Sequence, residues 1–276
     1  MRNYFTVLTI AGSDSSGGAG IQADIKTMSA IGCYGMSAIT SITAQNTTGV
    51  RSIMPVTPKV VADQIDMVME DVPPLAIKIG MLCNAEIAAT VADKLEQYRP
   101  GNVVLDPVMV STSGSLLLEQ DAIDVVTSRL FPLSTIITPN QHEARVLTGE
   151  TESDRQARVL MDMGAENILI KGGDTDRNDV KIDFLYLDKK ISPMRLSSDA
   201  VDTPNTHGTG CTLSSAIASF LALGYDLTSA VRHAKLYISH ALEAGSFVTV
   251  GKGHGPVNHF FSPRRLKNFN PKTFKK

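Results

Sequence analysis

The feature that most constrains the fold is the alternation of short apolar runs with longer helical patterns. Several apolar runs are continuous, as expected for strands that are covered on both faces. Strand and helix alternation predicts a parallel sheet with right-handed crossovers. The expected strands are 5–10, 37–44, 75–79, 102–105, 135–138 and 167–171, and the expected helices are 22–31, 59–70, 86–98, 122–129, 143–147, 155–163, 212–223 and 228–244.

One stretch interrupts this alternation. Two strand-like runs, 182–187 and 191–196, flank Asp188-Lys189-Lys190, and this pattern predicts a small β-hairpin near 180–196. No Pro-rich or Ser-rich linker divides the chain, so we expect one α/β domain over residues 1–262. Its mostly parallel central sheet should carry helices on both faces.

Charge and cysteine content argue against several classes of function. The formal net charge is −2, which gives no electrostatic footprint for nucleic acid or a membrane surface. The basic residues gather only in 263–276, which we interpret as a solvated C-terminal tail. No apolar run reaches about 18 residues, so no membrane span is expected. Cys33, Cys83 and Cys211 form no CxxC pair, so we expect neither disulfides nor zinc, and a cytoplasmic protein.

Four polar or glycine-rich turns each follow an expected strand directly. In open parallel sheets, ligands bind outside the carboxyl ends of the strands. The four turns therefore predict one shared cleft. They are Ile79-Gly80-Met81, Asp106-Pro107, Thr138-Pro139-Asn140 and Lys171-Gly172-Gly173.

A glycine pair leads into a helix of small and apolar residues in Thr206-His207-Gly208-Thr209-Gly210-Cys211-Thr212. Backbone N–H groups at a helix start, with the positive end of the helix dipole behind them, favour a phosphate. Cys211 lies where the loop becomes helix. Three interpretations stay open: an inert thiol, a covalent nucleophile, or a general base whose thiolate the helix N-terminus favours.

A second glycine-rich segment, Gly18-Ala19-Gly20-Ile21-Gln22-Ala23, matches the dinucleotide pattern G-x-G-x-x-A. The pattern needs a ribose-binding carboxylate about 20 residues onward, but the next strand closes on Gln45-Asn46. A loop that admits a flat ligand is therefore favoured over a nicotinamide site, with a capped structural turn left open. The Gln45 amide could bind the edge of a nitrogen heterocycle or cap the strand end.

Polar side chains at the other strand ends suit a nucleotide and its cation. Asn140 and Glu143 share a helix face and could support hydrated Mg²⁺, or simply cap that helix. Asp106 is a similar candidate for the metal. Lys171 could meet nucleotide phosphates or be a solvated strand-end lysine.

Together these segments resemble the bacterial hydroxymethylpyrimidine/phosphomethylpyrimidine kinases, which are members of the ribokinase-like superfamily. The resemblance runs in collinear order over roughly residues 5–260. Besides the turns quoted above, it is carried by Leu8-Thr9-Ile10-Ala11-Gly12-Ser13-Asp14, Ala44-Gln45-Asn46-Thr47, Lys78-Ile79-Gly80-Met81-Leu82, Val104-Leu105-Asp106-Pro107-Val108-Met109 and Gly251-Lys252-Gly253-His254-Gly255-Pro256-Val257.

The resemblance implies a ribokinase-like fold and ATP-dependent phosphorylation. The implied acceptors are 4-amino-5-hydroxymethyl-2-methylpyrimidine and then its monophosphate, for thiamin biosynthesis. By the same resemblance, Gln45 would bind the pyrimidine edge, and the pocket around the ring would be lined by Gly12, Asp24, Met81 and Val108. The anion hole would be formed by Gly208, Thr209, Gly210 and Cys211. Lys171 and Asn140 would meet ATP phosphates, and Glu143 with Asn140 and Asp106 would support Mg²⁺.

Two departures and two rival functions accompany this interpretation. Many ribokinase-like enzymes have Asp at the last anion-hole position, whereas this chain has Cys211, as the pyrimidine kinases do. Asp174 follows the Lys-Gly-Gly turn, where the superfamily often has His, and this departure bears only on how a lid would close over the nucleotide.

A pyridoxal or pyridoxine kinase is one rival function, against which Gln45 argues. A non-catalytic ligand-binding relative is the other, and a homodimer is one candidate assembly.

Overall fold

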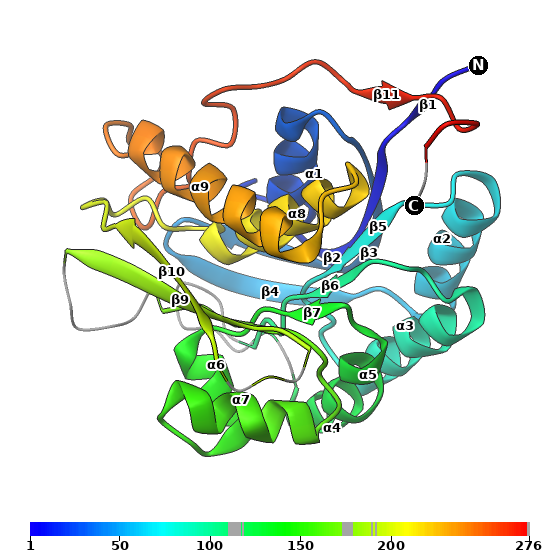
Figure 1. Ribbon diagram of the computed structural model, residues 1–276, viewed down its shortest axis with the longest axis horizontal. Coiled ribbons are helices and arrows are strands. Elements are labelled where there is room, and N and C mark those ends of the chain that lie inside the picture. The colour runs from blue at the N-terminus through cyan, green and yellow to red at the C-terminus, as the bar shows by residue number, and fades with distance from the viewer. Residues whose placement is uncertain (110–116, 118, 173–178, 189, 191, 275–276) are drawn as a thin grey trace.

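The computed structural model describes the chain except residues 110–116, 118, 173–178, 189, 191 and 275–276. Gly173, Asp174 and Lys189, which the sequence patterns singled out, lie outside the described residues. The described part forms a nine-stranded sheet of order β10-β9-β8-β7-β6-β5-β2-β3-β4 (Figure 1). The strands are β2 (Thr6–Asp14), β3 (Tyr34–Asn46), β4 (Gly49–Pro55), β5 (Ala76–Ile79), β6 (Val103–Leu105), β7 (Ile136–Ile137), β8 (Ile168–Ile170), β9 (Val180–Tyr186) and β10 (Met194–Asp199).

The centre of this sheet is parallel and its two ends are antiparallel. Strands β3, β2, β5, β6, β7 and β8 pair in parallel, whereas β4 pairs antiparallel with β3, and β9 with both β8 and β10. The prediction of a mostly parallel sheet with a hairpin near 180–196 is thus confirmed. The sequence pattern missed β4, because Gly49–Pro55 is largely exposed and forms no continuous apolar run.

Helices cover both faces of the sheet, as predicted (Figure 1). A π-helical turn, Val126–Leu130, continues the expected helix 122–129. In the described part, no helix is long and apolar enough to cross a membrane. One face carries α1 (Gly20–Ile31), α8 (Thr209–Ala222) and α9 (Leu227–Gly245), and the other carries α2 (Pro58–Asp71), α3 (Ala85–Tyr98), α4 (Gln120–Val125), α5 (Phe131–Leu133), α6 (Gln141–Thr148) and α7 (Ser153–Asp162).

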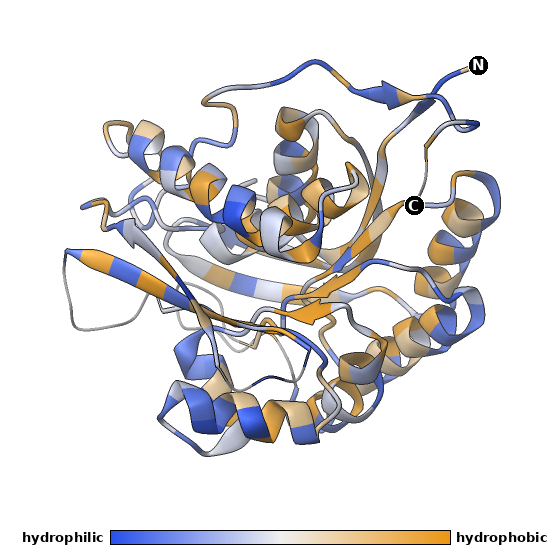
Figure 2. Cartoon of the chain, in the orientation of Figure 1, coloured by the Kyte–Doolittle hydropathy of each residue, from blue (hydrophilic) through white to orange (hydrophobic). Residues whose placement is uncertain are grey.

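Two hydrophobic cores result from the pleat of the strands. In β2, Val7 packs under the α1 and α8 side, and its neighbour Leu8 packs under the α2 and α3 side. Val103 and Val104 in β6 divide in the same way. All four are at most 1% exposed, so the central strands are apolar at every position rather than at alternate ones. Figure 2 shows this apolar interior.

The described part of the C-terminal segment keeps exposed basic side chains, such as Arg264 and Arg265, as expected of a solvated tail, but it is also docked on the N-terminal strand. Strand β11 (Asn268–Phe269) pairs antiparallel with β1 (Asn3–Tyr4). The ring centroid of Phe5 lies 4.8 Å from that of Phe269 and 5.4 Å from that of Phe274. The composition of this segment is dominated by lysines and arginines, but Phe269 and Phe274 are the residues that anchor it. The domain boundary at residue 262 stays a prediction.

We expect Phe269→Ala to lower the free energy of unfolding by about 2 kcal/mol, because the ring is partly buried against Phe5 and Phe274. Urea unfolding followed by circular dichroism measures the change. Phe247→Ala is the matched control, since Phe247 is 94% exposed and should shift stability by less than about 0.5 kcal/mol. Equal stability of the two variants would contradict the docking.

Candidate active site

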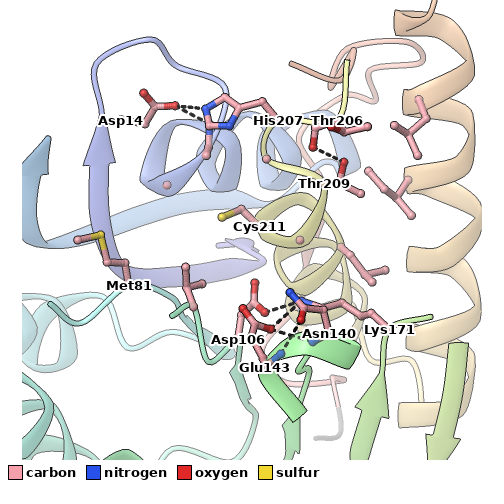
Figure 3. A pocket seen from close by; sticks show the side chains of 18 of the residues that line it. Asp14, Met81, Asp106, Asn140, Glu143, Lys171, Thr206, His207, Thr209 and Cys211 are labelled. Carbon is pink, nitrogen blue, oxygen red and sulfur yellow. Dashed lines mark hydrogen bonds and ion pairs between the residues drawn. The ribbon is translucent and has the colours of Figure 1, made fainter. Parts of the chain in front are cut away.

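A cavity of about 620 Å³ opens at the carboxyl ends of the parallel strands. Strand ends from across the sheet, the turn before α8 and one face of α9 line it, as the sheet-edge argument predicts. Figure 3 shows part of its lining. Of the predicted site residues, the lining contains Gly12, Gln45, Met81, Asp106, Val108, Asn140, Glu143, Lys171, Gly208, Thr209, Gly210 and Cys211, and it omits Asp24.

The turn before α8 leaves backbone donors pointing at the cavity. Gly208 has a φ of 79°, and a Cβ there would lie 1.8 Å from the carbonyl oxygen of Gly18, so only glycine fits. The N–H groups of Gly208, Gly210 and Cys211 find no acceptor in the described part of the chain, whereas that of Thr209 donates to the Thr206 carbonyl at 3.2 Å. The expected anion hole thus keeps three of its four amides.

Cys211 lies in the cavity wall, between the Asp14 and Asp106 clusters of Figure 3. The sulfur is therefore not packed away in the apolar interior. Burial raises the pKa of the thiol to about 11, although the nearby Lys78 ammonium and the N–H of Gly20, which donates to Sγ, both lower it. Because desolvation outweighs these effects, the raised pKa does not support the interpretation in which the helix N-terminus favours a thiolate, and the role of Cys211 stays a prediction.

Lys171 joins two carboxylates at the other side of the cavity (Figure 3). Its Nζ lies 2.8 Å from Oδ1 of Asp106 and 4.0 Å from Oε2 of Glu143. Burial raises the pKa of Glu143 to about 7; Asp106 also raises it, and Lys171 lowers it. Two buried carboxyl groups thus share one ammonium, so a bound cation would find negative charge in this cluster to balance its own.

The helix-capping alternative for Asn140 and Glu143 is also realised. The side chain of Asn140 accepts from the N–H of Glu143 at 2.7 Å, and Glu143 accepts from the N–H of Asn140 at 2.8 Å. This capping box starts α6. Because both residues line the cavity as well, the cap fixes their oxygens at the site rather than excluding them from it.

Asp24 lies beneath the cavity instead of lining it, which corrects its predicted position. Its carboxylate accepts from Thr9 at 2.6 Å, from Ser215 at 2.6 Å and from Lys78 at 2.8 Å. Asp24 and Lys78 are both 0% exposed. The buried pair supports the floor of the site.

Gln45 reaches the opposite end of the cavity. The register of β3 against β4 shifts between Ala44 and Gln45, and such an irregularity redirects a side chain. The amide oxygen lies 3.0 Å from the Thr43 hydroxyl, which donates to it. Gln45 thus lines the cavity with its amide oxygen held by Thr43, and its role toward a ligand stays a prediction.

Comparison with known proteins decides the family. The family described as Phosphomethylpyrimidine kinase matches residues 14–258. This chain belongs to that family. A Rhizobium meliloti (strain 1021) protein named Hydroxymethylpyrimidine/phosphomethylpyrimidine kinase is 46% identical over 259 residues, which are 92% of this chain and 96% of the relative.

Other relatives differ in length and in name. A bifunctional thiamine biosynthesis protein of Geobacter sulfurreducens is 46% identical, and the match spans 95% of this chain but 54% of that protein. The phosphomethylpyrimidine kinase structure from Clostridium difficile 630 has a TM-score of 0.72 and 45% identity, covering 86% of this chain and 99% of that one. The Staphylococcus aureus pyridoxal kinase structure in complex with pyridoxal has a TM-score of 0.84 and 32% identity, covering 96% of each chain.

The sequence did not point to several other charged or titratable lining residues, among them Asp14, His207, Asp183 and Lys235. Asp14 and His207 both line the cavity and share a hydrogen bond, with Nε2 2.8 Å from Oδ2. Asp183 holds Lys235 at 2.7 Å and accepts from the N–H of Gly172 at 2.9 Å. Asp14 and His207 stood inside the quoted motifs but 193 positions apart, so only the fold reveals their contact.

The raised pKa of Cys211 predicts how its reactivity depends on pH. Because the thiolate is the nucleophile, alkylation of Cys211 by iodoacetamide should rise about tenfold per pH unit from pH 7 to 10. Mass spectrometry assigns the site, with Cys211→Ser as the blank. A small cysteine peptide is the control, and its rate should level off above its ordinary pKa of about 8.5. A plateau for Cys211 below pH 9 would contradict the buried thiol.

Proposed function

We propose that this chain transfers the γ-phosphoryl group of ATP to 4-amino-5-hydroxymethyl-2-methylpyrimidine, and then a second one to the resulting monophosphate. The observation that carries the proposal is a set of three unpaired backbone N–H groups at the start of α8, facing the same cavity as Lys171. Preorganised amides of this kind stabilise charge that develops on a transferred phosphoryl group. Family membership supports the same reaction.

The two ends of the cavity suit the two substrates. Met81, Val108 and Gln45 line the cavity with apolar side chains and one amide, a combination that suits a flat nitrogen heterocycle. Gly12 allows close packing in this wall, since a Cβ there would lie 2.7 Å from the Ser41 hydroxyl and 3.1 Å from the Met81 sulfur. Lys171 stands at the other end, where its charge would offset that of the leaving diphosphate.

Mg²⁺ is the cation that we propose for the acidic cluster. Asp106, Glu143 and Asn140 would hold it, because two buried carboxyl groups there face a single ammonium. Within the described residues, no group of three or more His, Cys, Asp or Glu could hold a metal alone. Shared ligation by protein and nucleotide is the usual Mg²⁺ arrangement. When bound, the ion would neutralise phosphate charge.

The neutral thiol of Cys211 suits two different acceptors. The first acceptor is an alcohol that must lose a proton, and Cys211 would take up that proton in its minor thiolate form. The second acceptor is a phosphate that is already anionic and needs no base. A carboxylate at this position would repel it, whereas the uncharged thiol does not.

An assay of ATP consumption tests the proposed function directly. Purified protein is offered the pyrimidine alcohol, its monophosphate and pyridoxal, each with and without Mg²⁺. We expect turnover of both pyrimidines, with kcat/KM for pyridoxal at least about tenfold lower, and loss of turnover without the cation. Faster turnover of pyridoxal would favour the rival that the pyridoxal kinase fold similarity suggests.

We expect Cys211→Ala to lower kcat of the first phosphorylation by about 100-fold and that of the second by less than about threefold. Cys211→Asp should retain part of the first activity and suppress the second, because of charge repulsion. Initial rates on each acceptor measure both effects. Equal losses in the two steps would contradict the division of roles.

A homodimer remains a prediction about assembly. Most apolar positions of α9 are buried within the chain, where Ala230, Ala234 and Ile238 belong to the same core as α8. Leu236 is the exposed exception on that helix, at 55%. Sedimentation equilibrium measures the state in solution.

A further inference from the structure

The carboxylate of Asp14 organises the glycine-rich loop that follows β2. It is 3% exposed and accepts from both the N–H and the hydroxyl of Ser16, and from the N–H groups of Gly18 and Ala19. Burial raises its pKa, but these donors and His207 outweigh burial and lower it to about 2. The carboxylate is therefore charged and fixed by the loop around it.

His207 brings the anion-binding turn onto this loop. Its Nε2 lies 2.8 Å from Oδ2 of Asp14, and its backbone N–H donates to the Gly255 carbonyl at 3.0 Å. The two loops interlock tightly, since a Cβ on Gly18 would lie 2.3 Å from the His207 ring. Figure 3 shows the pair beside Cys211. The glycine-rich loop and the phosphoryl end of the cavity thus meet through one charged contact.

The hydrogen bond between His207 and Asp14 also determines whether the amide hydrogens of Gln45 are used within the protein. A carboxylate only accepts, so Nε2 of His207 must carry the hydrogen of its bond to Asp14. The amide nitrogen of Gln45 lies 3.5 Å from that nitrogen, and two donors do not bond to each other. Its hydrogens therefore stay available to a ring nitrogen of a ligand.

From these contacts we propose that Asp14 and His207 are positioning residues that set the ring-binding loop and Gln45 at a fixed distance from the amides of Gly208 and Cys211. This inference rests on the proposed function, because it assigns a role in transfer between the two ends of the cavity. The pair touches neither reacting atom. It acts by keeping the acceptor oxygen in line with the phosphoryl group, where a misplacement of about 1 Å costs about 100-fold in rate.

The experiment compares His207→Leu with His207→Gln. Leucine removes the donor, so kcat should fall about 100-fold on whichever acceptor the wild type phosphorylates, with KM for ATP unchanged within twofold. Glutamine can donate to Asp14 again and should recover at least tenfold of the loss. His233→Leu, on the exposed side of α9, is the matched control and should keep wild-type rates.

Further variants separate positioning from folding. Melting temperatures identify any unfolded variant, and Asp14→Asn replaces His207→Leu if the latter does not fold. The double variant Asp14→Asn/His207→Leu should be no slower than the slower single variant, because the two act as a unit. Unchanged kcat in folded His207→Leu, or no recovery by glutamine, would overturn the proposal. Failure of the wild type on both pyrimidines would instead overturn the proposed function, and the variants would then be compared on the accepted substrate.

Discussion

One buried carboxylate ties together the layers on which the site is built. Asp24 of α1 accepts from Thr9 of β2, from Lys78 of β5 and from Ser215 of α8, all away from solvent. Burial works to lower the pKa of Lys78, but Asp24 outweighs burial, and the pKa stays above its ordinary value. Removing either partner would strand a charge in the interior, so the two strands and two helices keep their relative positions. The same contacts hold the start of α8, and therefore also the backbone N–H groups of Gly208, Gly210 and Cys211.

The charged groups above this floor adjoin the anion-binding turn. Lys171, Asp106 and Glu143 gather at one wall, and the start of α8 lies directly beside them, since a Cβ on Gly210 would lie 3.4 Å from Nζ of Lys171 and 3.5 Å from Oδ2 of Asp106. The Cys211 thiol in the same cavity lining is neutral near pH 7, since burial raises its pKa. Phosphate can therefore be held by dipoles and one ammonium, with no carboxylate at position 211 itself. This arrangement allows an alcohol and a phosphate monoester to use one acceptor position.

The sequence predicted the parts of the fold that depend on local pattern. Apolar runs marked the central strands, and Lys171, Asp106 and the glycines before α8 converge as the sheet-edge rule requires. It could not place Asp24, because a carboxylate beside a glycine-rich loop looks the same whether it faces ligand or a buried lysine. The sequence also left three interpretations of Cys211 open, because the helix dipole is local, whereas desolvation depends on packing from the whole fold. The contact of Asp14 with His207 and the pairing of β11 with β1 each join segments that lie far apart in the sequence. No local pattern in either segment predicts its partner.

The pairing of β1 with β11 brings residues 3–4 and 268–269 together at the amino edge of the sheet, since β1 leads directly into β2. The cavity lies at the opposite, carboxyl edge. A folded module joined to either end would emerge from the same corner and leave the mouth of the cavity clear. The architecture therefore tolerates fusion or surface tethering at both ends without blocking substrate entry.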